Sequence, residues 1–199
     1  MPQPSRLLAT ALVLAALLAA PAASAASTGK TGGAYTHPQP VGVQVGDIVF
    51  GHSPGIVDDL IPGYWTHVGV VAAYDPQEGW LVVEALPGRG VVLTPLSQFL
   101  SRYPTVALAH VDAAPGERQA AAQFALQQLG KPYDYNYLTK EAIGPSYYCS
   151  ELAWASYKAI GGPDIDQNPG WTLKYADAVA PQEIYDDNDT AVYYFHSAS

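Results

Sequence analysis

The sequence predicts one α+β domain, because strand patterns gather early in the chain and helical patterns follow later. This clustering differs from the regular alternation of strand and helix that builds a parallel βαβ sheet. Neither an internal repeat nor a second domain is visible in the 199 residues. About 170 residues after the N-terminal segment suffice for one domain with a hydrophobic core.

The first 25 residues have the pattern of a secretory leader. Arg6 supplies a positive charge, residues 7–20 form an apolar run, and Ala23-Ser24-Ala25 is a small-x-small pattern for cleavage before Ala26. The apolar run is short for a membrane span, which needs about 20 residues. We therefore expect an exported protein, secreted or in the cell envelope, with no stable membrane insertion after cleavage. Retention of the leader as an anchor is the alternative.

The remaining elements follow from turn residues and apolar periods. Residues 26–42 are rich in Ser, Thr, Gly and Pro and predict a flexible lead-in to a domain over 43–199. Val-rich runs between turn signals predict strands at 48–50, 67–74, 80–86, 91–94, 105–111 and 191–196. Helical patterns are expected at 55–60, 95–100, 115–129, 136–143, 149–160 and 181–185. Phe124 and Leu129 are expected to face the core.

The composition is acidic and rich in aromatic residues. Without Arg6, eight basic residues face eighteen acidic ones, a net charge of about −10. At long range such a surface repels nucleic acid and anionic lipid, so we expect no nucleic-acid partner. Fourteen tyrosines and four tryptophans favour aromatic-lined clefts, although many of these side chains also pack in cores.

Cys149 is the only cysteine, and it opens the helix predicted over 149–160. Unpaired backbone N–H groups and the helix dipole at that position favour the thiolate, which is the nucleophilic form. The same N–H groups could stabilise an oxyanion. Cysteines of exported proteins normally occur in pairs, so a single one suggests a reactive thiol or an intermolecular disulfide. A small buried apolar residue is the structural alternative.

A cysteine nucleophile needs a base and a polar group that orients this base. His67 heads a Val-rich strand, and the following strand carries Glu84 in an otherwise apolar run. If Tyr74 pairs with Gly79, Gly69 faces Glu84, and His67 and Glu84 become diagonal neighbours about 7–8 Å apart by Cα. A slip of one residue would put them on opposite faces. The alternatives are a solvated strand face for the acid and a backbone cap for the histidine.

Further candidates surround these residues in the sequence. Tyr148, Tyr133 and Tyr135 could each donate a phenol O–H to an oxyanion or a substrate carboxylate, or pack in the core. Trp65 is a candidate for substrate binding. Asp47 could hydrogen-bond in the cleft, although a turn role is favoured by its position. No cluster has zinc spacing and no acidic loop resembles a calcium site, so we predict no metal or other cofactor.

Several segments, taken in order, resemble the circularly permuted branch of the NlpC-type papain-like superfamily, and in particular its YiiX-like members. In that branch the cysteine helix follows the histidine strand, as it does here. The resemblance spans about residues 43–196. It is carried by GDIVF at 46–50, THVGV at 66–70, VEA at 83–85 and YCSEL at 148–152, together with 130–136 and 180–185.

The resemblance implies a permuted papain-like fold, with a barrel-like antiparallel sheet packed against the helix of Cys149. It implies Cys149 as nucleophile, His67 as base and Glu84 as orienting acid, although other superfamily members place different polar residues in the third role. The implied reaction is hydrolysis of amide bonds in cell-wall peptides or N-acyl amino acids through an acyl-enzyme. The alternatives are a lipid-directed acyltransferase or thioesterase, and a non-catalytic binding module. The oligomeric state stays open.

Overall fold

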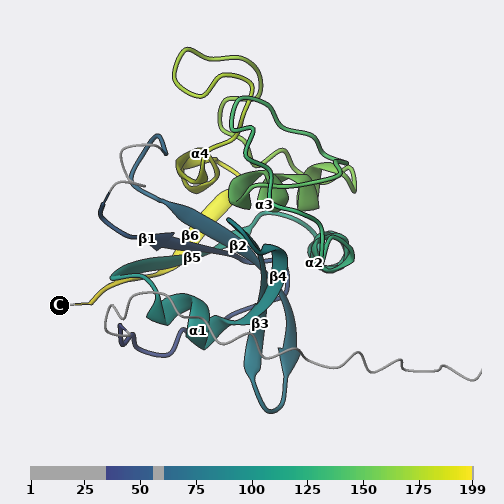
Figure 1. Ribbon diagram of the computed structural model, residues 1–199. Helices are drawn as coiled ribbons and strands as arrows, with labels where there is room; N and C mark the ends of the chain where they lie inside the picture. Colours follow the sequence, from purple (N-terminus) through teal and green to yellow (C-terminus); the bar gives the residue numbers. More distant parts are fainter. Residues whose placement is uncertain (1–34, 56–60, 199) are drawn as a thin grey trace, which may run out of the picture. The chain divides into compact units, whose positions relative to one another are not determined.

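The structure is a computed structural model that describes residues 35–55 and 61–198 (Figure 1). Its centre is a six-stranded antiparallel sheet in the order β4-β3-β2-β1-β5-β6. The strands are β1 (Ile48–His52), β2 (His67–Asp75), β3 (Gly79–Leu86), β4 (Gly90–Pro95), β5 (Thr105–Val111) and β6 (Thr190–Ser197). The helices are α1 (Leu96–Ser101), α2 (Pro115–Gln127), α3 (Cys149–Lys158) and α4 (Pro181–Asp186). The predicted α+β class is confirmed.

Each face of the sheet buries its own hydrophobic core. Side chains alternate along a strand, so Val68 and Val70 of β2 join the core under α2 and α3, whereas Val71 joins the core under α1. Figure 1 shows this arrangement, with α2 and α3 on one side of the sheet and α1 on the other. The helix that begins at Cys149 therefore packs on the sheet opposite to α1.

The prediction of a helix at 136–143 is wrong. This segment forms turns and one isolated bridge, the pairing of Thr139 with Asp177. The Asn136 amide donates to Thr139 Oγ1 at 2.7 Å and its oxygen accepts the N–H of Leu138 at 3.3 Å. Such local side-chain bonds give the backbone an alternative to a helical turn.

The helix α2 ends two residues earlier than expected. Phe124 is partly buried against the core, as predicted, but Leu129 lies beyond the last helical residue and is 40% exposed. The prediction that Leu129 faces the core is therefore wrong, because the helical spacing no longer applies after Gln127. None of the helices in residues 35–55 and 61–198 is long and apolar enough to cross a membrane.

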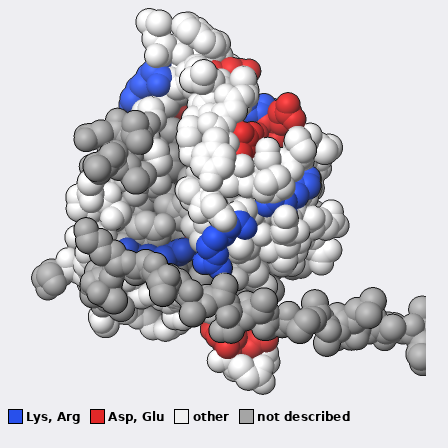
Figure 2. Space-filling model, in the orientation of Figure 1, with Lys and Arg blue, Asp and Glu red and all other residues white. Residues whose placement is uncertain are grey.

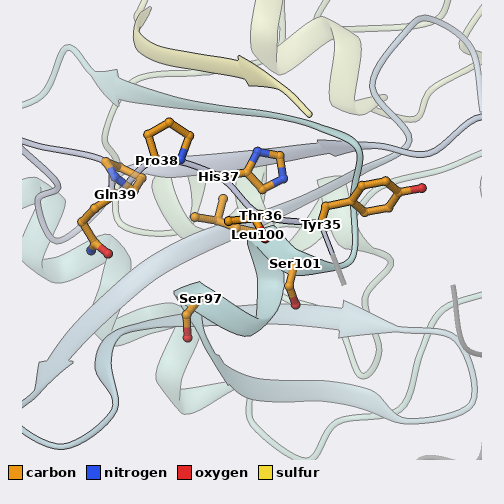
Figure 3. A pocket seen from close by; sticks show the side chains of 9 residues that line it. Tyr35, Thr36, His37, Pro38, Gln39, Ser97, Leu100 and Ser101 are labelled. Atoms are coloured by element: carbon orange, nitrogen blue, oxygen red, sulfur yellow. The ribbon is translucent and has the colours of Figure 1, made fainter. Parts of the chain in front are cut away.

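Residues 35–40, part of the predicted lead-in, are hydrogen-bonded to the domain. The N–H of Tyr35 donates to Ser101 O at 2.9 Å, and His37 Nε2 lies 2.9 Å from Tyr103 O. Together with α1, these residues line a surface pocket of about 190 Å³ (Figure 3). The predicted leader, residues 1–25, and residues 56–60 of the expected helical turn lie outside the described residues.

Charged side chains form small separate groups on the face of the molecule shown in Figure 2. Most of the described surface visible there is uncharged, as expected when only 14% of the residues are Asp, Glu, Lys or Arg.

Candidate active site

Cys149 is the first residue of α3, so its backbone lies in the turn whose N–H groups have no helical partner. The preceding residue, Tyr148, is extended, and its N–H donates to the Glu151 carboxylate at 3.2 Å. The same carboxylate accepts the N–H of Glu141 at 2.7 Å. Glu151 therefore stabilises the start of the helix. Cys149 itself is 5% exposed and lies in the core that α3 shares with the sheet.

His67 is the first residue of β2 and is held on two sides. Its Nε2 lies 2.7 Å from Oε2 of Glu84. Its ring packs nearly parallel to the rings of Phe99 and Tyr103, with centroid distances of 5.5 and 5.8 Å. Hydrogen bonding and ring packing together fix the orientation of the imidazole and leave Nδ1 for a second partner.

The bond between His67 and Glu84 depends on a bulge in β2. Near the turn Tyr74 pairs with Trp80, so the predicted pairing of Tyr74 with Gly79 is wrong by one residue. The register then shifts between Val71 and Ala73. Beyond this bulge Val70 pairs with Val83, which is the predicted register and puts His67 and Glu84 on one face of the sheet.

Sequence reasoning missed Arg102, the second partner of Glu84 and the fourth residue of this group. It follows α1, and its Nη2 lies 2.7 Å from both oxygens of Glu84. Glu84 is fully buried, and a buried carboxylate is costly unless it is paired. That cost indicated a partner for Glu84 but could not point to Arg102, because no motif links the two residues.

The charged side chains in this group shift one another's pKa values. Burial alone lowers the pKa of His67, but the charge of Cys149 and hydrogen bonds with Cys149 and Glu84 outweigh it and raise the pKa to about 9. Burial raises the pKa of the Cys149 thiol, but the charge of His67, its hydrogen bond and the N–H of Val68 lower it overall. Burial also opposes the ionisation of Glu84, yet His67 and Arg102 lower its pKa to about 2. The favoured state is a thiolate beside an imidazolium.

The candidate tyrosines differ in their surroundings. Burial and then the charge of Cys149 raise the pKa of Tyr133, whose phenol oxygen accepts a bond from Tyr137 Oη at 3.3 Å. Tyr135 is mostly exposed, and its phenol oxygen accepts the N–H of Gly88 at 2.9 Å. The phenol oxygen of Tyr148 accepts the N–H of Val179 at 3.1 Å, and burial raises its pKa. Tyr133 and Tyr148 are therefore neutral at physiological pH and keep a proton to donate.

Asp47 and Trp65, the other two candidates for substrate binding, each have structural contacts of their own. Asp47 accepts bonds from Gln44 N and Tyr193 Oη, both at 2.8 Å, in the turn before β1. It is four residues from Gly51, the strand partner of His67, and therefore about 13 Å away along β1. Trp65 is only 1% exposed, because its ring packs in the core.

Gly69 leaves the space that the adjacent strand β3 needs, above all at Val82. A Cβ at this position would lie 2.6 Å from Val82 Cγ1, 3.1 Å from Val83 O and 3.4 Å from Glu84 Cβ. We expect Gly69→Ala to lower the free energy of unfolding by about 1–3 kcal/mol, because the adjacent strand must shift. Urea unfolding measures this loss. Gly116→Ala is the control, since a Cβ there meets no atom within 4 Å. A Gly69→Ala protein as stable as the wild type contradicts this prediction.

Comparison with known proteins supplies the family. The model of a family described as a permuted papain-like amidase enzyme, YaeF/YiiX, C92 family, matches residues 42–194. The chain belongs to this family. As a member of the permuted papain-like amidases, it has the predicted permuted fold, with the helix of Cys149 following the strand of His67. The description of this family as amidases agrees, at the level of the family, with the predicted cysteine hydrolase.

Two relatives illustrate how far the likeness extends. The uncharacterized protein YycO of Bacillus subtilis (strain 168) is 28% identical over 106 residues, which are 52% of this chain and 41% of YycO. The chain thus matches less than half of the length of YycO. The crystal structure of the metalloprotein YiiX from Escherichia coli O157:H7 has a TM-score of 0.61 and 23% identity, and the match covers 77% of this chain and 98% of YiiX. That likeness concerns the fold.

The description of YiiX as a metalloprotein applies to YiiX. Within residues 35–55 and 61–198 of this chain, no three His, Cys, Asp or Glu side chains lie close enough together to bind a metal ion. The described residues therefore do not fit a metal site.

Proposed function

We propose that this protein is an exported cysteine amidase with Cys149 as nucleophile, His67 as base and Glu84 as orienting acid. The observation that carries the proposal is the 2.7 Å bond from His67 Nε2 to Glu84, combined with the burial of Cys149 at the start of α3, where His67 lowers the pKa of its thiol. A nucleophile, a base and a group that orients the base are the parts that covalent acyl transfer requires. The proposed export depends on the leader pattern in residues 1–25.

The reaction follows from this arrangement. The Cys149 thiolate attacks the amide carbonyl carbon, and backbone N–H groups at the start of α3 stabilise the oxyanion. As the C–N bond breaks, imidazolium His67 gives its proton to the leaving amine, and an acyl-enzyme remains. Neutral His67 then takes a proton from a water molecule that attacks the thioester carbonyl. The acid is released, and the thiolate and the imidazolium form again.

Amide bonds in cell-wall peptides or N-acyl amino acids are the proposed substrates, because the family is described as amidases and such compounds lie outside the cytoplasm. Lipid-directed acyl transfer is the second candidate. It is favoured by apolar side chains on two neighbouring segments that the bond from Asp177 N to Leu138 O joins. Leu138, Ile143, Trp171 and Leu173 are each at least two-thirds exposed there. Such a surface suits an acyl chain.

Product analysis distinguishes these candidates. Wild type and Cys149→Ala are incubated with peptidoglycan fragments, with N-acyl amino acids and with acyl lipids, and the products are identified by mass spectrometry. We expect free amines and acids from the amide pools with the wild type alone. Conversion of the lipid pool alone supports the second candidate. If no pool differs between the two proteins, both enzymatic proposals fail and a binding module on this fold remains.

A further inference from the structure

We propose that Arg102 is a positioning residue of the reactive group, which holds Glu84 ionised and aimed at His67. This inference depends on the proposed function and adds a fourth residue to it. Arg102 itself does not touch the reacting atoms. It acts through Glu84, which orients His67, and His67 in turn interacts with Cys149.

Arg102 contacts the three side chains that hold His67. Its Nη2 lies 2.7 Å from Oε1 and 2.7 Å from Oε2 of Glu84. Its guanidinium carbon lies 5.1 Å from the ring centre of Phe99 and 5.5 Å from that of Tyr103. Both rings pack against the imidazole. Moving Arg102 therefore changes the hydrogen bond to His67 and the rings beside it together.

The position of Arg102 indicates that the buried carboxylate of Glu84 requires its positive charge. Its side chain is 30% exposed, whereas that of Glu84 is fully buried, so the arginine links the buried acid to the surface. Arg102 Nε is buried without a hydrogen-bond partner among the residues that the structure describes. Burying an unpaired N–H is unfavourable. The guanidinium is held there by Glu84 and by the two rings in spite of that loss.

The charges alternate from Arg102 through Glu84 and His67 to Cys149, so the group is neutral as a whole in its thiolate–imidazolium state. The other titratable side chains that interact with it are Tyr103, Tyr133 and Tyr148, and all three are neutral because burial raises their pKa. Without the arginine, the group carries one net negative charge in a buried site. Loss of the thiol proton then becomes less favourable, and the thiolate forms at higher pH.

Lysine replaces only part of this function. A guanidinium presents a planar fork that bonds a carboxylate and stacks on aromatic rings, whereas an ammonium group is a compact and strongly hydrated charge. We therefore expect Arg102→Lys to restore the charge effect partly and the contact with the two rings poorly. Neutral variants lose both.

The test is the pH dependence of iodoacetamide labelling of Cys149, measured from pH 4 to 10 by mass spectrometry. We expect the midpoint of thiolate formation to rise by about one pH unit in Arg102→Met, with a smaller rise in Arg102→Lys. Arg118→Met is the matched control: it removes the same charge in α2, near Gly46 before β1, and we expect the wild-type midpoint. A merely structural role lowers the melting temperature but leaves the midpoint of the folded protein unchanged.

An unchanged midpoint in folded Arg102→Met overturns the proposal. If that variant does not fold, Arg102→Gln replaces it, since glutamine is neutral but can still donate to Glu84. A midpoint for Arg102→Gln equal to that for Arg102→Lys then overturns the proposal as well. Failure of the proposed function is a separate result, because slow labelling of the wild type at pH 6 contradicts the reactive thiolate whatever the arginine variants do.

Discussion

Replacing His67 with alanine is expected to slow the alkylation of Cys149 by iodoacetamide at pH 6 by about 10- to 100-fold. A thiol with the ordinary pKa of about 8.5 is only about 0.3% ionised at that pH. In the wild type, the charge and hydrogen bond of His67 overcome the effect of burial and lower the pKa of the thiol. Thiolates of low pKa are intrinsically weaker nucleophiles, which keeps the expected ratio below the full ratio of ionised fractions.

Labelling at high pH distinguishes a loss of thiolate formation in His67→Ala from a loss of access to the thiol. At pH 10 both proteins carry a thiolate, so the two labelling rates should approach one another. His110→Ala is the control, because His110 contacts Asp47 at the other end of β1 at 2.8 Å and should not affect Cys149. Equal labelling of wild type and His67→Ala at pH 6 removes the support for an activated thiol.

Glu84→Gln is expected to lower the free energy of unfolding by about 3 kcal/mol at pH 7. The substitution keeps the size of a fully buried side chain but removes the negative charge between His67 and Arg102. An uncompensated cation then remains beside the core. The expected loss is at the lower end of the range measured when one partner of a buried ion pair is removed. The reason is that Arg102 is partly exposed and water can solvate it.

The sign of the pH dependence follows from the lowered pKa of Glu84. Its ionised form stabilises the folded state fully above the unfolded pKa of about 4.5, and this contribution is lost as the pH falls through about 2. The difference between wild type and Glu84→Gln should therefore shrink as urea unfolding is repeated at pH 4.5, 3.5 and 2.5.

Glu151→Gln is the control for this second prediction. Glu151 is also buried, but burial raises its pKa to about 7, so the loss of its charge at pH 7 should affect stability less. A difference between wild type and Glu84→Gln that stays constant from pH 7 to 2.5 contradicts the role of the Glu84 charge.

The parts of the candidate site that could be predicted are those with local signals. A helix beginning at Cys149 follows from helix-forming residues between the Gly144-Pro145-Ser146 turn and the paired glycines at 161–162, and the structure has α3 at Cys149–Lys158. The strand of His67 follows from its Val content. In contrast, the helix expected at 136–143 is replaced by side-chain bonds of Asn136, which propensity does not reveal.

The sequence by itself determined the residue types, the positions of the strands along the chain and the helix that carries the cysteine, because periodicity and turn residues act over a few positions. Only the tertiary structure decided how these parts meet. The bulge between Val71 and Ala73 restores the register that joins His67 to Glu84, and the packing of α1 on the sheet brings Arg102 to the same carboxylate. Both depend on contacts between segments far apart in the chain, where one extra residue reverses the face on which a side chain lies.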